Sequence, residues 1–185
     1  MKHIDKTSLA YLPSRIEYIT DFLEFGPEDA QCLHDSVSIL SPLIKTIVDA
    51  VYVKLFSYSI TKAVFIPKNK RQEISLDDEE IKIRKDFLSR WFVKVVTADY
   101  SNPKTWEYFD RVGVQHAPKK EGDQPLVDYM QCAILLGWVF DRLIPAVVTH
   151  DGIDERQKIK LLTALNKIVW IQNDCFAKHY IKASI

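Results

Sequence analysis

The chain has 185 residues, 47% of them hydrophobic and 11% aromatic, which is enough apolar material for the core of one domain. Lys plus Arg and Asp plus Glu are equal at 25 each, so no net positive charge attracts nucleic acid or an anionic membrane surface. Residues 1–15 lack the apolar core of a signal sequence, and no later segment approaches the roughly 18 uninterrupted apolar residues of a membrane span. We therefore expect one soluble, cytoplasmic domain over residues 1–185, without nucleic-acid or membrane partners.

The cysteines favour a reducing compartment. Cys32, Cys132 and Cys175 are an odd number, lie far apart and form no Cys-x-x-Cys pair. This pattern argues against a disulfide framework and against a thiolate metal site.

Turn signals are sparse along the chain. Only five glycines occur, and no Asn-Gly or similar pair separates alternating segments, so the pattern predicts an all-α fold. Gly26 is expected to end the first helix, while Pro27 and Pro42 stand at the first positions of the second and the third. The first four helices are expected at residues 15–25, 27–41, 43–58 and 60–65.

The second half of the chain is expected to hold four longer helices. The polar, aperiodic segment 66–78 predicts a loop. Asn102 and Pro103 predict the start of one helix and Pro125 the start of another, which Pro145 should kink. These helices are expected at residues 79–98, 104–117, 126–150 and 154–180, which gives about eight in total.

His116 is the residue that most needs an explanation. It ends the stretch YFDRVGVQH, where it shares an apolar stripe with Phe109 and Val112 at helical spacing. A histidine at the end of a helix can be a core residue whose charge the helix dipole favours, or it can be a ligand. Gly113 lies inside the same helix, where it costs about 1 kcal/mol relative to alanine, and this suggests that a flat or bulky group passes close by. A single axial histidine in an aromatic, helical pocket is what haem iron requires.

Other chemistry is not indicated by the spacing of the polar residues. The five histidines are isolated, with no His-Glu-x-x-His motif, so a dedicated zinc or di-iron site is not expected. No Gly-x-Ser-x-Gly turn or Gly-rich phosphate loop occurs, although a serine or cysteine nucleophile with a histidine base stays open. The charged segments PKNKR and HAPKKEG are interpreted as solvated loops.

Three parts of the chain resemble the globin-coupled sensor and protoglobin family. They are DAVYVKL at residues 49–55, the segment 83–117, and LLGWVFDRLIPAVV with LNKIVWIQNDCFAKHY in the last two helices. The distinguishing motifs are Arg-Lys-x-Phe followed by Arg-Trp, and the Gly-x-x-His that ends the expected F helix. The resemblance covers nearly the whole chain and is closest to stand-alone fungal protoglobin-like proteins. It implies a globin-like fold with an extra N-terminal helix.

By this resemblance, His116 is the proximal ligand of haem b. Its Nε2 would bind the iron, and its Nδ1–H would be held by a backbone carbonyl or a nearby polar group. Tyr52 matches the distal tyrosine that donates a hydrogen bond to bound gas, with a half-buried core tyrosine as the other interpretation. Val51 stands where relatives place tryptophan, so the distal gating of those relatives is not implied here. The expected E helix carries no histidine.

The remaining expected haem contacts are apolar side chains that fit a plain core equally well. The loop from Ala117 to Pro125 is shorter than in relatives, so propionate contacts do not carry over from them. Lys119 and Lys120 could meet the propionates or be solvated. The expected wall residues are Val51, Phe87, Leu88, Trp91, Val112, Leu135 and Leu136.

The resemblance implies a haem protein that reversibly binds O2, CO or NO as a gas carrier or sensor. It also implies a homodimer formed through the last two helices, with Trp138, Phe140 or the exposed part of 154–180 at the interface. A haem-free globin-fold interaction or stress-sensing module is the alternative. Nitric oxide dioxygenase or peroxidase activity would require a reductase partner or a more polar distal pocket.

Overall fold

The computed structural model describes residues 1–66, 74–119 and 127–181, and every regular element within these ranges is helical, as the sequence predicts. The described residues form eight α-helices and two short 3₁₀ helices. In chain order they are η1 (Lys6–Ala10), α1 (Leu12–Phe22), α2 (Pro27–Asp35), α3 (Val37–Phe56), α4 (Ser59–Lys62), η2 (Ala63–Phe65), α5 (Glu79–Thr97), α6 (Pro103–His116), α7 (Tyr129–Val148) and α8 (Glu155–Tyr180).

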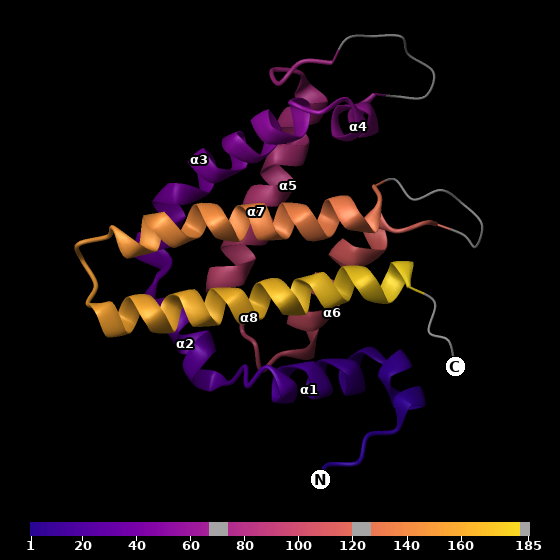
Figure 1. The fold of residues 1–185 in the computed structure, drawn as a ribbon, viewed down its shortest axis with the longest axis vertical. Helices are drawn as coiled ribbons and strands as arrows, with labels where there is room; N and C mark the ends of the chain where they lie inside the picture. The colour runs from indigo at the N-terminus through magenta and orange to yellow at the C-terminus, as the bar shows by residue number, and fades with distance from the viewer. Residues whose placement is uncertain (67–73, 120–126, 182–185) are drawn as a thin grey trace.

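The two C-terminal helices form the front of the molecule. Figure 1 shows α7 and α8 lying side by side, with α3 and α5 passing behind them and with α1 and α4 at opposite ends. Helix α8 contacts α1, α2, α6 and α7, while α3 packs on α5 and α7. The chain therefore wraps four of its other helices around α8.

Helix α8 occupies this central place because a broad apolar face runs along it. Its start is defined by a capping box, in which the Asp154 carboxylate accepts from the Gln157 N–H at 2.7 Å and the Gln157 side chain accepts from the Asp154 N–H at 3.0 Å. Its buried residues recur at helical spacing, as expected for a helix packed on several neighbours. They are Leu161, Ala164, Leu165, Ile168, Val169, Ile171, Gln172, Cys175 and Phe176.

Helix α6 is delimited by its own sequence at both ends. The Asn102 side chain accepts from the Lys104 N–H at 3.0 Å, and Pro103 takes the first helical position, where its missing N–H is not needed. The last helical residue is His116, and the Ala117 N–H still donates to a carbonyl of the final turn. The sequence thus places His116 in the last turn of a well-capped helix.

The expected helix boundary at Pro42 is wrong, because the break lies at Ser36. The Ser36 hydroxyl donates to the Leu33 carbonyl at 2.8 Å, and the Ser36 backbone leaves helical values. Pro42 lies inside α3, where it cannot donate to the Ser38 carbonyl one turn earlier. Both Ser38 and Pro42 are exposed, so water can bond that carbonyl and the helix continues.

Helix α7 begins at Tyr129, later than the expected start near Pro125, which lies outside the described residues. Asp128 has extended backbone angles and acts as the N-cap residue. The connection from α6 therefore runs from Ala117 to Asp128 and is longer than the loop expected from the sequence. Helix α7 continues through Pro145, which lies inside it.

On length and composition alone, α7 is the one helix among the described residues that could cross a membrane. This is weak support for a membrane span, because core helices of soluble proteins pass the same test. Here α7 packs against α3 and α8 and buries Cys132, Val139, Leu143 and Val147.

Candidate functional site

A cavity of about 590 Å³, the main cavity, lies between α3, α5, α6, α7 and α8. This volume is in the range of small-molecule and cofactor sites. All nine residues expected at the site line it, although they come from four helices and span 86 positions of the chain (136 minus 51, plus one). They are Val51, Tyr52, Phe87, Leu88, Trp91, Val112, His116, Leu135 and Leu136.

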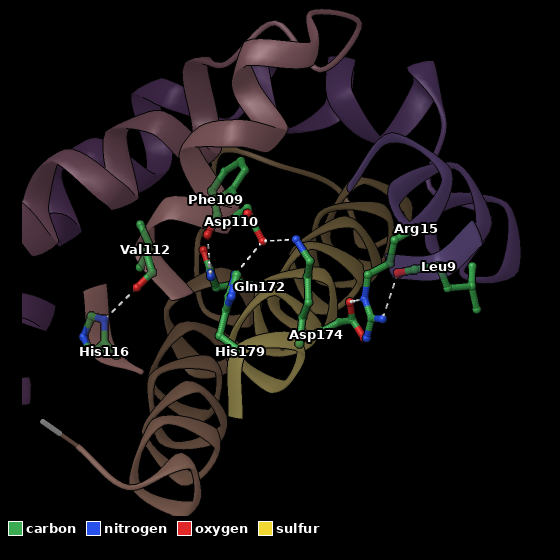
Figure 2. Close-up of polar contacts among 10 residues, drawn as sticks. Leu9, Arg15, Phe109, Asp110, Val112, His116, Gln172, Asp174 and His179 are labelled. Carbon is green, nitrogen blue, oxygen red and sulfur yellow. Dashed lines mark hydrogen bonds and ion pairs between the residues drawn. The ribbon is translucent and has the colours of Figure 1, made fainter. Parts of the chain in front are cut away.

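His116 is held with one ring nitrogen against the backbone of its own helix. Figure 2 shows the contact between its Nδ1 and the Val112 carbonyl oxygen, which are 2.8 Å apart. A carbonyl only accepts, so Nδ1 carries the proton and the neutral ring keeps a free electron pair on Nε2. The ring also packs edge-on against Phe176 at 5.2 Å between centroids. The histidine is therefore oriented by a hydrogen bond and by an aromatic neighbour.

The surroundings of His116 favour its neutral form. Burial lowers its pKa from the ordinary value, the hydrogen bond to Val112 opposes this effect, and the charge of Arg84 lowers the pKa further. A neutral imidazole is the form that binds a metal ion. The ring is thus kept ready for a ligand on its Nε2 side.

Tyr52, on α3, is buried in the wall of the same cavity. Desolvation raises its pKa to about 12, so its hydroxyl keeps its proton throughout the physiological range. No hydrogen bond to this hydroxyl occurs among the described residues, although the ring packs against Phe65 at 5.8 Å. The Tyr52 hydroxyl is therefore a protonated donor whose capacity is not used by the described part of the chain.

Gln172 connects three of the helices around the cavity. Its side-chain oxygen accepts from the Trp91 indole N–H at 2.8 Å, and its side-chain nitrogen donates to the Phe109 carbonyl at 3.2 Å. It is only 1% exposed, so both polar ends of a buried amide are satisfied. This bridge ties α5 and α6 to α8 beside the cavity.

The reason for Gly113 differs from the one expected from the sequence. A Cβ atom at this position would lie 2.1 Å from the Cys175 carbonyl oxygen and 2.8 Å from its carbonyl carbon. Gly113 therefore lets the backbone of α8 approach α6, and the flat or bulky neighbour is a helix rather than a haem face. The close approach of two backbones is a long-range contact that the spacing of residues in α6 does not encode.

A polar clamp holds the same side of α6. One carboxylate oxygen of Asp110 receives the Lys178 ammonium at 3.0 Å and His179 Nε2 at 2.8 Å. Figure 2 labels Asp110 and His179. Nearby, Arg15 of α1 forms a two-point ion pair with Asp174 of α8, at 2.6 and 2.7 Å. All these groups are half-buried, so the end of α8 is fixed to both α6 and α1.

Arginines occur in the lining of the main cavity, and no Asp or Glu does among the described residues. Arg84 also bonds Glu80 at 2.9 Å and Arg90 pairs with Asp86 at 2.6 Å, whereas Arg111 is exposed. Lys119 is exposed and does not line the cavity, and Lys120 lies outside the described residues.

Several lining residues were not among those expected from the sequence. Gln172 and Phe176 lie one turn apart on the buried face of α8, so the periodicity of that helix was the available signal. Phe65 comes from the short helix η2, and its ring contacts Tyr52 and Phe56 of α3 and the guanidinium of Arg84 on α5. No sequence signal distinguishes it from an ordinary core residue.

The described residues contain no cluster of three or more His, Cys, Asp and Glu side chains that could hold a metal ion without further groups. The three cysteines are free, and burial raises the pKa of the Cys175 thiol to about 12. His116 is therefore a candidate for the single axial ligand of a cofactor-borne metal, rather than for a site built from protein ligands alone.

Comparison with known protein families matches residues 12–184 to Protoglobin. The chain belongs to the protoglobin family. The match includes α1 to α8 and confirms the family resemblance stated from the sequence. Comparison with curated proteins found no match.

Among solved structures, the chain is similar to the globin domain of the Geobacter sulfurreducens globin-coupled sensor. The TM-score is 0.72, and the alignment covers 90% of this chain and 98% of that one at 16% sequence identity. At this identity the likeness shows the fold alone, which is the all-α globin fold of the globin-coupled sensor type, as the sequence predicts.

Proposed function

We propose that the chain binds haem b in the main cavity and there reversibly binds O2, CO or NO, as a soluble, cytoplasmic gas carrier or sensor. Membership of the protoglobin family and the globin fold support a globin-type gas-binding role. The observation that carries the proposal is the geometry of His116, which lines the cavity with Nδ1 on the Val112 carbonyl and with no described residue bonded to Nε2.

The lining residues fit the chemistry of haem. His116 supplies one nitrogen ligand, and side chains such as Leu88, Trp91 and Leu136 supply the apolar walls that exclude water from a porphyrin ring. Arg111, which is exposed, could pair with the haem carboxylates at the edge of the cavity. When bound, haem would supply a ferrous iron that binds a diatomic gas reversibly.

Tyr52 is the residue that we assign to the bound gas. Its protonated hydroxyl can donate to the partial negative charge on bound O2, and in a dry pocket one such hydrogen bond contributes about 1–3 kcal/mol. Val51 is fully buried beside it and places no polar group there. Tyr52 is therefore the buried, protonated donor that we assign to the distal side.

The size of the main cavity argues against a haem-free interaction module whose pocket is closed by side chains. The absorption spectrum of the purified, reduced protein with and without CO distinguishes a haem protein from a haem-free module. Haem binding predicts a strong Soret band that shifts with CO. A colourless protein that takes up no added haem would contradict the proposal and leave the haem-free module.

We further propose a homodimer through α7 and α8, whose front faces no other helix covers in Figure 1. Exposed apolar side chains recur on both helices at helical spacing. The half-buried Trp138 and Phe140, which the sequence put at the interface, pack against the core and so contribute less to this face. The exposed residues are Met130, Ile134, Ile144 and Val148 on α7, with Ile159 and Trp170 on α8.

Sedimentation of Trp170→Glu tests the dimer. Trp170 is 55% exposed, so a charge there should not unfold the monomer but should dissociate an apolar interface by burying an unpaired carboxylate. Ile83→Glu, on α5 and 49% exposed, is the matched control and should stay dimeric. A monomeric wild-type protein, or a dimer that survives Trp170→Glu unchanged, would contradict this interface.

A further inference from the structure

Arg84 of α5 brings a positive charge to the wall of the main cavity, and the proposed function leaves this charge without a role. Its side chain is 32% exposed, whereas no Asp or Glu lines the cavity among the described residues. Its ion-pair partner is Glu80, one turn earlier on the same helix, at 2.9 Å. The Glu80 side chain is 47% exposed, and ion pairs in contact with water are weak. Arg84 can therefore exchange Glu80 for another anion.

The guanidinium of Arg84 has more hydrogen-bond donors than its described contacts use. A guanidinium carries five N–H donors and no acceptor. One bond, from Nη2 to Glu80, joins it to the described residues. A cation–π contact with Phe65, at 5.3 Å from Cζ to the ring centre, holds the group beside the cavity. The remaining donors are available to a bound anion.

Tyr52 of α3 lies near Arg84, because the Phe65 ring contacts both. The ring centre of Phe65 is 5.8 Å from that of Tyr52 and 5.3 Å from Arg84 Cζ, so the last two points are at most 11.1 Å apart (5.8 plus 5.3). Burial raises the pKa of Tyr52 and the charge of Arg84 lowers it, which agrees with a guanidinium near the phenol. Tyr52 is only 6% exposed, and its hydroxyl bonds no described residue. One side of the main cavity thus offers a cation and a protonated hydroxyl.

We propose that Arg84 and Tyr52 form an anion-binding site in the main cavity, which takes a small inorganic anion with one negative charge. Arg84 supplies the charge and several N–H donors, and the Tyr52 hydroxyl supplies one more. This site does not require haem. Its effect on haem ligands rests on the proposed function: the site then favours O2, which becomes partly negative on binding, over CO.

Azide is a suitable probe, because it is a small anion with one negative charge. Arginine Nε–Hε resonances of the haem-free full chain are recorded by NMR during an azide titration at constant ionic strength. The Arg84 resonance, identified by its loss in Arg84→Gln, should shift and approach saturation. Tyr52→Phe removes one donor and should weaken azide binding about threefold or more. Shifts of Arg84 that do not saturate, or an affinity unchanged by Tyr52→Phe, would overturn the proposed site.

Arg90 provides a matched control on the same helix. It also lines the main cavity, pairs with Asp86 one turn earlier and lies over an aromatic ring, Phe87, but its side chain is 69% exposed. Arg84→Gln should weaken azide binding about tenfold or more, and Arg90→Gln less than about twofold. Glu80→Gln removes the competing carboxylate and should strengthen binding about twofold. Equal losses in the two arginine variants would indicate a general charge effect and refute the site.

The selection between haem ligands has its own measurement. In the haem-loaded protein, Arg84→Gln should speed O2 release about fivefold or more and change CO release by less than about twofold, whereas Arg90→Gln should change neither. Unchanged O2 release, or equal changes for both gases, would remove Arg84 from ligand selection. A lower haem affinity with unchanged O2 release would instead make Arg84 a partner of the haem carboxylates.

The two experiments separate failure of the anion site from failure of the proposed function. If the protein carries no haem, the proposed function fails, while the azide titration still reports on Arg84 and Tyr52. If the haem-free chain does not fold, the release rates of O2 and CO from the haem-loaded variants decide whether Arg84 acts on the ligand.

Discussion

Helix α6 has two neighbouring faces that are built in opposite ways. On one face, Gly113 allows the backbone of α8 to approach so closely that a Cβ would lie 2.1 Å from the Cys175 carbonyl oxygen, and Asp110 binds Lys178 and His179. On the other face, His116 lines a cavity of about 590 Å³.

The difference between these two faces shows how α6 is held in position beside a cavity. A cavity beside His116 removes packing partners that would otherwise restrain α6. The tight contact at Gly113, the clamp at Asp110 and the bridge through Gln172 restrain the same helix within two turns of the histidine. The closed face therefore compensates for the open one. Substitutions on the closed face should change stability, and those around the cavity should change ligand binding.

Gly113→Ala should have the largest effect on stability. The added methyl group meets backbone atoms of Cys175, which cannot rotate away, so α6 and α8 must separate. We expect a loss of about 2–3 kcal/mol in the free energy of unfolding, measured by denaturant titration, despite the better helix propensity of alanine. Gly137→Ala is the matched control, because nothing lies within 4 Å of its Cβ position; it should stabilise by about 0.5–1 kcal/mol. Equal effects at the two glycines would refute the close contact.

Tyr52→Phe should change ligand release rather than stability. Loss of the donor should speed O2 release about tenfold or more, which corresponds to about 1.4 kcal/mol, as measured by stopped-flow mixing. The free energy of unfolding should change little, because no described residue forms a hydrogen bond with the Tyr52 hydroxyl. Tyr58→Phe is the control, since Tyr58 is 53% exposed and lies outside the cavity lining. An unchanged rate of O2 release in Tyr52→Phe would remove Tyr52 from the distal role.

In the haem-free protein, where Nε2 of His116 has no iron to bind, acidification should lower the free energy of unfolding by a smaller amount. Because its pKa is lowered in the folded protein, the unfolded chain binds the proton more readily. The stability that neutral His116 contributes is complete above about pH 6.5 and is lost as the pH falls through the folded-state pKa. The difference in unfolding free energy between wild type and His116→Asn should therefore shrink from pH 7.5 to 5. A difference that does not vary with pH would contradict the buried, neutral histidine.

The helices and the stripe around His116 could be predicted from local patterns, whereas the other expected site residues followed from the family resemblance. The stripe that contains Val112 and His116 lies within one helix, and the family resemblance named the facing residues on other helices. Pro42 gave a wrong helix boundary, because proline is common at the first position of a helix and the sequence alone does not show its surroundings. Inside α3 this exposed proline is tolerated, since water can bond the carbonyl that it leaves without a donor. The role of Gly113 could not be predicted from α6 alone, because the glycine makes room for the backbone of α8 at Cys175, 62 positions away (175 minus 113).

The most direct test of the account compares two histidines. His116 of α6 lines the main cavity, whereas His179 of α8 bonds Asp110 on the closed face of α6. The Soret band and the CO spectrum are recorded for purified His116→Ala and His179→Ala. His116→Ala should lose the normal spectrum, and added imidazole should restore part of it by occupying the space left by the side chain. His179→Ala breaks the bond to Asp110 and should keep the spectrum at some cost in stability. A full-strength, CO-responsive spectrum in His116→Ala would contradict the assignment of His116 as the iron ligand.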